Sequence, residues 1–343
     1  MARKTVKRSP VTDEMYSKVN EDNKLLLKEF IEYLQSIGRS EGTINNYKSD
    51  LRILFCWAVT NARNKSFVDF VKKDFIRYQN YELNELGLSP NRIRRMRSAM
   101  SSLANYIENI CDDEYPDFKN IVNKLEAPDK RTVREKTILE DDECQSLLDD
   151  LVKNKKYQQA CAFALAWASG RRKSELLRIK KSYIVEENLK FGSMYKTNEK
   201  IKTKGKGGGK YIYVWILKNK FKPYFDLWMK ERDRLGVPKD MDEMFVVKVN
   251  GEWKPASVAT LDYYSEVFSK KLNKDFYFHC LRHQFTTELV KSNIPASIIK
   301  DIVGWESTDM VDLYTDIDVE DRLEEFFDEN GIKEVEQKSI KDL

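Results

Sequence analysis

Residues 157–176 read YQQACAFALAWASGRRKSEL, so the most apolar part of the chain runs directly into a charged turn. The spacing predicts an apolar helix from about Tyr157 to Ala168. The apolar run covers only Ala160 to Ala168, whereas a membrane span needs about 20 such residues. The stretch therefore predicts a helix of a protein core, and we expect no membrane partner.

The 343 residues around this stretch predict two domains, because single cores rarely grow beyond about 250–300 residues. Residues 1–20 are basic and polar and are expected to be flexible, and 21–126 carry apolar residues at helical spacing. A charged, non-periodic stretch at 127–137 predicts a linker, followed by a second domain at 138–318 and an acidic tail at 319–343. The fold class expected is mainly α, with a helical N-terminal bundle and an α-rich C-terminal domain holding a small antiparallel sheet.

Individual elements can be placed within these domains. Thr43 and Thr137 are candidate N-caps of two helices, and Ser89-Pro90 predicts the start of another, because proline suits the first helical position. The helix beginning there carries Ile93 and Met96 on its apolar face. Residues 183–185 and 211–216 are rich in β-formers, and Gly207, Gly208 and Gly209 lie between them, so we expect strands there.

Basic residues are concentrated in two places, although the net charge is only +4. One cluster is Arg92, Arg94, Arg95 and Arg97, on the helix that starts at Ser89. The other is a lysine-rich hairpin that includes Lys202, Lys204 and Lys206. Such patches attract phosphate backbones, so the four arginines, Lys202 and Lys204 are candidates for DNA binding, with a solvated face as the alternative.

The two histidines of the chain lie together in Phe278-His279-Cys280-Leu281-Arg282-His283. If a helix begins near Leu281 with His279 outside it, the imidazole and the guanidinium of Arg282 sit where free backbone N–H groups favour an anion. Half of a zinc site is the alternative, but no CxxC pair or further histidine completes four ligands. His283 is more simply a core histidine, and we expect no metal. The five scattered cysteines fit reduced thiols in the cytoplasm.

Three segments in this order resemble the boxes of the tyrosine recombinase (phage integrase) family. Residues 168–176 resemble its Thr-Gly-x-Arg-x-Ser-Glu-Leu, which selects Arg172 over Arg171. His279 and Arg282 match its His-x-Leu-Arg-His. Gly304-Trp305, followed nine residues later by Tyr314, resembles its third box, with tryptophan where histidine is commoner. Residues 20–126 also resemble the core-binding domain of the family.

The resemblance implies a recombinase that binds a specific duplex site and cuts through a 3′-phosphotyrosine on Tyr314, with no cofactor, metal or ATP. Arg172, Arg282, His279 and Trp305 would surround the phosphate, and Lys206 or Lys204 would protonate the leaving oxygen. Glu175 would orient its neighbours. Planar guanidinium groups match phosphate geometry, which supports these roles. A type IB topoisomerase and a non-catalytic DNA-binding protein are the alternatives.

The resemblance also implies a homotetramer on synapsed DNA, with possible accessory DNA-bending or directionality proteins, working at the nucleoid in the cytoplasm. Leu323, Phe326, Phe327 and Ile332 lie among acids in residues 319–332, which predicts an amphipathic helix. In this family such a helix commonly docks on a neighbouring subunit, so we expect the tail to be exchanged between protomers.

Overall fold

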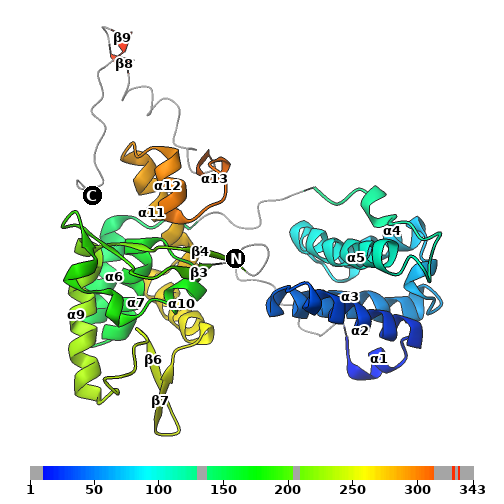
Figure 1. Ribbon diagram of the computed structural model, residues 1–343, viewed down its shortest axis with the longest axis horizontal. Helices are drawn as coiled ribbons and strands as arrows, with labels where there is room; N and C mark the ends of the chain where they lie inside the picture. The colour runs from blue at the N-terminus through cyan, green and yellow to red at the C-terminus, as the bar shows by residue number, and fades with distance from the viewer. Residues whose placement is uncertain (1–10, 130–136, 204–208, 313–326, 329–330, 333–343) are drawn as a thin grey trace. The chain divides into compact units, whose positions relative to one another are not determined.

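The computed structural model describes residues 11–129, 137–203, 209–312, 327–328 and 331–332. The chain divides into two compact units near residue 135, and each is described by itself. Both are mainly helical, with short antiparallel strands in the C-terminal unit (Figure 1). This confirms the predicted fold class. Among the described helices, none is both long and apolar enough to cross a membrane.

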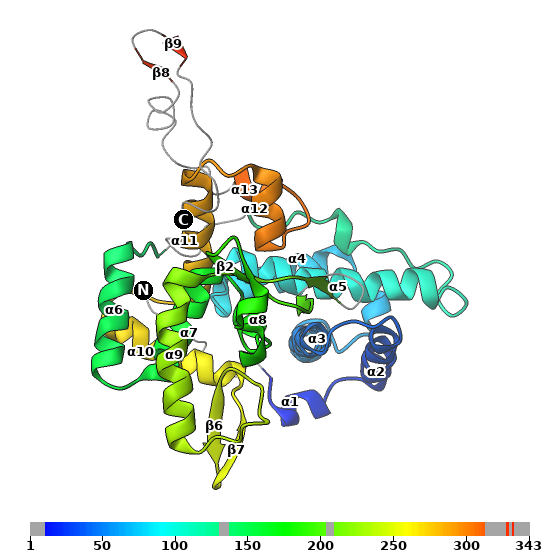
Figure 2. The ribbon, with the colours of Figure 1, turned by 60° about the vertical axis from the view of Figure 1, so that its left-hand side comes forward.

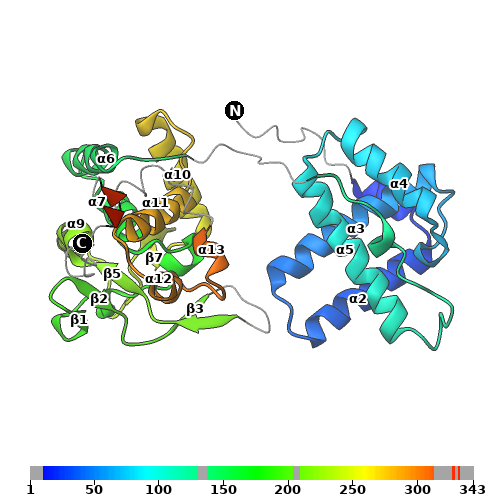
Figure 3. The same ribbon diagram turned by 90° about the horizontal axis from the view of Figure 1, so that it is seen from above.

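The N-terminal unit is a bundle built around α3. Its helices are α1 (Asp13–Ser17), α2 (Glu21–Ser36), α3 (Glu41–Asn61), α4 (Lys72–Asn80) and α5 (Pro90–Ile110), with a π-helical turn at Tyr81–Glu85 and 3₁₀ turns at Phe67–Asp69 and Val122–Lys124. Helix α3 packs between α2 and α5 (Figures 1 and 3). The apolar face of α5 is buried at Ile93 and Met96, and Ser89 caps the helix through its hydroxyl, as predicted.

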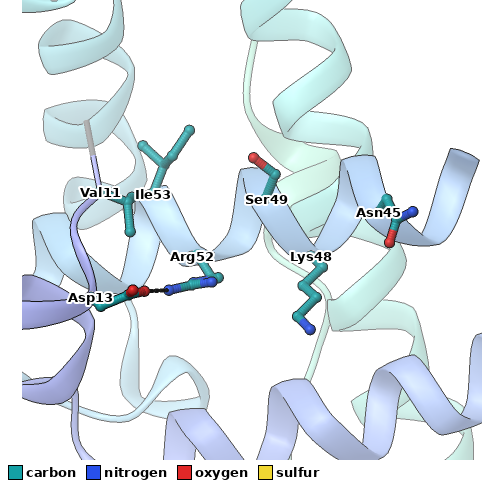
Figure 4. Close-up of a pocket in the computed structure, with 7 residues that line it drawn as sticks. All are labelled: Val11, Asp13, Asn45, Lys48, Ser49, Arg52 and Ile53. Carbon is teal, nitrogen blue, oxygen red and sulfur yellow. Dashed lines mark hydrogen bonds and ion pairs between the residues drawn. The ribbon is translucent and has the colours of Figure 1, made fainter. Parts of the chain in front are cut away.

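Two N-terminal predictions are corrected. Helix α3 begins before Thr43, because the Ser40 hydroxyl accepts from the Thr43 amide and acts as the cap. Residues 13–17, expected within a flexible tail, form α1. Asp13 of this helix pairs with Arg52 of α3 at 3.1 Å (Figure 4), and the Arg52 guanidinium lies 4.2 Å from the Tyr16 ring centroid. These two contacts dock α1 on the bundle.

The C-terminal unit is arranged around α7. Its helices are α6 (Asp141–Lys153), α7 (Tyr157–Ser169), α8 (Lys173–Leu176), α9 (Lys218–Leu235), α10 (Val258–Leu272), α11 (Phe278–Lys291), α12 (Ala296–Val303) and α13 (Asp309–Asp312). Residues 160–169 of α7 are all buried, and this helix contacts α6, α8, α9 and α11. The apolar stretch at residues 160–168 therefore lies in the central helix of this unit.

The strands are short and antiparallel. They are β1 (Leu189–Lys190), β2 (Met194–Lys196), β3 (Ile201–Thr203), β4 (Lys210–Ile212), β5 (Trp215–Leu217), β6 (Val246–Val249), β7 (Glu252–Pro255), β8 (Phe327–Asp328) and β9 (Gly331–Ile332). One sheet has the order β1-β2-β5, and the remaining strands form three hairpins: β3–β4, β6–β7 and β8–β9. The β6–β7 hairpin projects from the unit (Figure 2).

Four predictions in this unit are corrected. Helix α6 begins at Asp141 because Glu140 and Glu143 form a capping box, so Thr137 is not the cap. The segment at Lys181–Tyr183 is a 3₁₀ turn and no strand. Helix α11 begins at Phe278, so His279 is helical. The expected tail helix does not continue to residue 332, because Phe327 pairs with Ile332 across β8 and β9. Residues 319–326 lie outside the described part.

Candidate active site

Arg172 stands at the start of α8 and is held by Glu175. Its Nη1 donates to Glu175 Oε1 at 2.8 Å and to Thr203 Oγ1 at 3.2 Å, and its backbone N–H donates to Glu175 Oε2 at 3.2 Å. The Thr203 hydroxyl also donates to Glu175. The Arg172 side chain remains 32% exposed, whereas Glu175 is 1% exposed. A buried carboxylate thus fixes a guanidinium that solvent or a ligand can still reach.

Glu175 keeps its charge in this setting. Burial alone would raise the pKa of its carboxyl group, but the charge of Arg171 and the hydrogen bonds from Thr203 and Arg172 outweigh burial. The net result is a pKa below the usual value for glutamate. An ionised Glu175 is therefore present at neutral pH to orient Arg172.

Arg171, the residue that the family motif passes over, is completely buried. Its Nε donates to the backbone oxygen of Ser169 at 3.0 Å, and its Nη2 donates to that of Ile302 at 2.6 Å. Burial lowers the pKa of its guanidinium to about 10, so the group stays charged at neutral pH. Arg171 therefore joins the end of α7 to the end of α12, and its role is structural.

Arg282 joins the same two helix ends from α11. It is 1% exposed, and its Nη1 and Nη2 donate to the backbone oxygens of Gly170 and Val303, each at 3.0 Å. The last carbonyls of a helix lack partners within the helix and carry its negative dipole end, so a cation is stabilised there. We call Arg171 and Arg282, with the four carbonyls that they bind, the arginine bracket.

Two glycines allow the helix ends to meet in the arginine bracket. Gly170 and Gly304 end α7 and α12 with φ of +59° and +78°, a left-handed conformation that glycine adopts without strain. A Cβ atom on Gly170 would lie 2.6 Å from Phe285 Cδ1, and one on Gly304 would lie 2.6 Å from Ile212 Cδ1. At Gly170 a larger residue would push against the Phe285 ring as far as its Cβ, and at both positions the positive φ would strain any residue with a side chain.

His279 lies in the first turn of α11, near the arginines. The centroid of its ring is 4.8 Å from that of His283, and the two rings are nearly perpendicular. Burial around the ring, followed by the charges of Arg282 and Arg172, lowers the pKa of His279. The neutral imidazole is therefore the dominant form at neutral pH, and it can accept a proton. His283 is partly buried.

Trp305 follows α12 directly and is 5% exposed. Its ring centroid is 5.6 Å from the guanidinium carbon of Arg282. Its backbone oxygen accepts from Lys210 Nζ at 3.0 Å, which connects β4 to the end of α12. Lys210 was not singled out by the sequence, because one lysine in a basic hairpin carries no signal of such a contact.

The structure thus brings together Arg172, Glu175, His279, Arg282 and Trp305. Lys204, Lys206 and Tyr314 lie outside the described residues. Strand β3 places Thr203 against Glu175, and it holds Lys202 in an exposed position. In the sequence, β3 is followed directly by the segment that contains Lys204 and Lys206. The described residues of the third box end at Asp312, two residues before Tyr314.

The four arginines on α5 have different surroundings. Arg92 and Arg95 bind the buried carboxylate of Asp50, with Nη2 to Oδ1 distances of 2.5 and 3.2 Å. Arg94 donates to the Pro128 oxygen at 2.7 Å, and Arg97 donates to the backbone oxygens of Val122 and Leu125. Arg94 and Arg97 therefore fasten the 122–128 segment, and only Arg92 and Arg95 keep the character of a candidate DNA contact.

Comparison with known proteins supplies independent information. The profile of the Phage integrase family matches residues 137–321, and that of the Phage integrase N-terminal SAM-like domain matches residues 26–117. The SPbeta prophage-derived recombinase-like protein YomM of Bacillus subtilis (strain 168) is 30% identical over 292 residues, 84% of each chain. Tyrosine recombinase XerD of Staphylococcus haemolyticus is 24% identical, over 85% of this chain and 94% of that protein.

Solved structures share the fold. XerH site-specific recombinase bound to palindromic difH substrate matches with a TM-score of 0.65 and 19% identity, over 92% of this chain and 96% of that chain. A lambda integrase dimer bound to a COC′ core site matches with a TM-score of 0.60 and 19% identity, over 97% of this chain and 85% of that chain.

Proposed function

This chain belongs to the phage integrase family and is a site-specific tyrosine recombinase, and from that premise we propose that it cuts and rejoins DNA through a 3′-phosphotyrosine on Tyr314. The observation that carries the proposal is the gathering of Arg172, His279, Arg282 and Trp305 from three separate segments. The phosphotyrosine would conserve the energy of the broken bond, so neither ATP nor a metal is required.

Arg172 is the proposed first contact of the scissile phosphate. Its side chain is accessible, permanently charged and held by an ionised Glu175. Attack by an oxygen adds charge to the non-bridging oxygens of the phosphate, and donors fixed beforehand stabilise that charge. Arg282 supports the same charge from its buried position behind Trp305. Loss of one such donor typically slows the reaction about 100–1,000-fold.

Two proton transfers accompany the reaction. A tyrosine hydroxyl with an ordinary pKa of about 10 is a weak nucleophile at neutral pH, so it needs a proton acceptor. His279, kept neutral by burial and by its arginine neighbours, is proposed for that role. The leaving 5′-oxygen must gain a proton, which Lys206, with Lys204 as the alternative, is proposed to deliver.

The proposed partner is duplex DNA at a specific recombination site, bound near the nucleoid in the cytoplasm. Synapsis of two sites would bring four protomers together, with accessory DNA-bending or directionality proteins where the site requires them. The names of the solved relatives support DNA as the ligand, because XerH is bound to difH and lambda integrase to a core site.

The test uses a nicked suicide substrate carrying the protein's own site. Wild-type protein should form a covalent protein–DNA complex that survives denaturing gel electrophoresis, and Tyr314→Phe should bind the same DNA without forming it. A covalent complex with Tyr314→Phe would refute Tyr314 as the nucleophile. Binding without a complex by the wild-type protein would indicate a non-catalytic DNA-binding protein.

A further inference from the structure

The turn between β1 and β2 holds a phenylalanine in a backbone conformation that suits it poorly. Phe191 and Gly192 have φ of +56° and +74°, and the Ser193 amide donates to the Lys190 oxygen at 3.2 Å. Turns with two positive φ values favour Asn, Asp or Gly, and a bulky residue there costs about 1–3 kcal/mol. The Phe191 ring is nevertheless 62% exposed. Strain at an exposed aromatic residue points to a use other than packing.

Phe191 begins a series of neighbouring rings and ammonium groups on the β1-β2-β5 sheet and on the segments that adjoin its strands. Its ring stacks on Trp215, with centroids 6.4 Å apart and planes within 13°. Lys196, opposite Trp215 in the strand register, places its Nζ 5.4 Å from that ring centroid and 4.3 Å from the centroid of Tyr213. Lys200 Nζ lies 5.7 Å from the Tyr213 centroid. We call these five residues the ring row.

The charges around the ring row favour an anionic ligand. Lys190 adds a third ammonium group at the end of β1. Glu199 is the one acid among residues 196–200, and it accepts a hydrogen bond from the hydroxyl of the buried Tyr183 at 3.0 Å. Glu186 lies 4.0 Å from the ammonium of Lys218. Glu199 and Glu186 therefore have partners of their own, and Glu187 is the remaining described acid near the row in sequence.

We propose that the ring row binds single-stranded nucleic acid. Alternating aromatic faces and cations match a chain in which unpaired bases alternate with phosphates, because any base can stack on an exposed ring. A duplex hides its base faces and would leave the rings without a partner. The inference goes beyond the proposed function; strand exchange is one source of unpaired DNA, but the binding itself does not depend on cleavage.

The experiment measures the affinity of the full chain for a labelled oligo(dT) of about 15 nucleotides and for a duplex of equal length, by fluorescence anisotropy. Phe191→Asn and Tyr213→Ala remove rings from the row. Tyr211→Ala is the matched control, because Tyr211 is 56% exposed and lies on the separate β3–β4 hairpin. Arg92→Gln serves as a second control for electrostatic attraction elsewhere on the chain.

Each ring variant should weaken oligo(dT) binding at least about fivefold, the effect of losing one stacked base, and leave duplex binding unchanged. Phe191→Asn should also keep or raise the melting temperature, because asparagine suits the turn. Equal losses on oligo(dT) and duplex, or the same loss with Tyr211→Ala, would overturn the inference. So would a lower melting temperature for Phe191→Asn, which would make the ring a packing element. Covalent complex formation by Tyr314 is not involved, so failure here leaves the proposed function standing.

Discussion

Arg171 and Arg172 are adjacent in the sequence but perform different tasks. Arg171 is fully buried and bound to carbonyls of α7 and α12, whereas the Arg172 side chain is 32% exposed beside Glu175. The family motif selects Arg172 and gives Arg171 no role. A sequence signal for Arg171 did exist: it directly follows the glycine that ends an apolar helix, where carbonyls need donors.

Arg171→Ala should therefore act on stability. Two buried carbonyls lose their donor, and each unsatisfied group costs about 1–3 kcal/mol, so the free energy of unfolding should fall by at least ~2 kcal/mol. Urea denaturation measures this. Arg172→Lys is the matched control, because it keeps a cation beside the buried Glu175; it should lose much less stability but slow formation of the covalent complex. Equal losses of stability in the two variants would contradict the division of roles.

Glu82 makes the stability of the N-terminal unit depend on pH. Its side chain is fully buried in the π-helical turn, and burial raises the pKa of the carboxyl group from 4.5 to about 8, despite the nearby charge of Arg92. Because the folded pKa is the higher one, folding is progressively penalised as the pH rises from about 4.5 to 8. Glu82→Gln removes this penalty.

Glu82→Gln should be more stable than the wild type at pH 8, by up to a few kcal/mol, since one pKa unit corresponds to about 1.4 kcal/mol. The advantage should shrink as the pH falls and disappear below 4.5. Thermal unfolding of both proteins across this range tests the prediction. A stability difference that is independent of pH would show that Glu82 does not titrate in this way.

At the scale of elements, the sequence located most helices but displaced several of their first residues. Ser40 rather than Thr43 caps α3, and α11 begins before Leu281. Several polar residues near a helix start can each serve as a cap, and only the folded geometry selects one. The tail was misjudged at Phe327 and Ile332, because their apolar character fits a paired strand as well as a helix face.

The four arginines of α5 form two pairs with different partners, and the salt dependence of DNA affinity can distinguish the pairs. Replacing Arg92 and Arg95 by glutamine should weaken binding to all DNA sequences. It should also make the slope of log affinity against log salt shallower by about 0.9 for each lost phosphate contact. Replacing Arg94 and Arg97, which bind carbonyls of residues 122–128, should lower stability without changing the slope. If the slope of log affinity against log salt stays unchanged when Arg92 and Arg95 are replaced, these arginines bind Asp50 and make no phosphate contact.

The β3–β4 hairpin carries the proposed general acid. Lys206→Ala should slow cleavage of a normal phosphodiester and regain most of its rate on a 5′-bridging phosphorothiolate, whose sulfur leaves without a proton. Lys204→Ala is the parallel variant, expected to cleave both substrates at similar relative rates. Rescue of Lys204→Ala in place of Lys206→Ala would move the role to Lys204.

For the whole molecule, the acidic tail remains the proposed contact between protomers. Removal of residues 318–343 should leave binding to a single site nearly intact and reduce synaptic complexes and recombination. Burial of apolar side chains such as Leu323 and Phe326 on a neighbour would contribute about 1.5–3 kcal/mol each. Gel-shift assays with one and two sites measure both effects. Normal synapsis by the truncated chain would rule out exchange, and insolubility without DNA would indicate that the tail packs on its own domain.

Apolar periodicity, which is a local pattern, predicted the two-unit helical organisation. The resemblance to the phage integrase family selected Arg172, His279, Arg282 and Trp305, which the structure brings together. The sequence could not predict the arginine bracket, since Arg171 and Ile302 are 131 positions apart and Arg282 and Gly170 are 112 apart. Only tertiary packing brings these donors and carbonyls together. For the same reason Lys210, 95 positions from Trp305, carried no sequence signal.

The arginine bracket also determines when during its synthesis the C-terminal unit can close around α7. Ribosomes release the N-terminal unit first, and domains generally fold as units in that order. Arg171 and Arg282 find their second carbonyls only when residues 302 and 303 have emerged. A nascent or prematurely terminated chain that ends before them can carry the basic face of α5 but has no closed bracket behind Arg172. The C-terminal unit can therefore close only late in translation, after its most apolar helix has already left the ribosome.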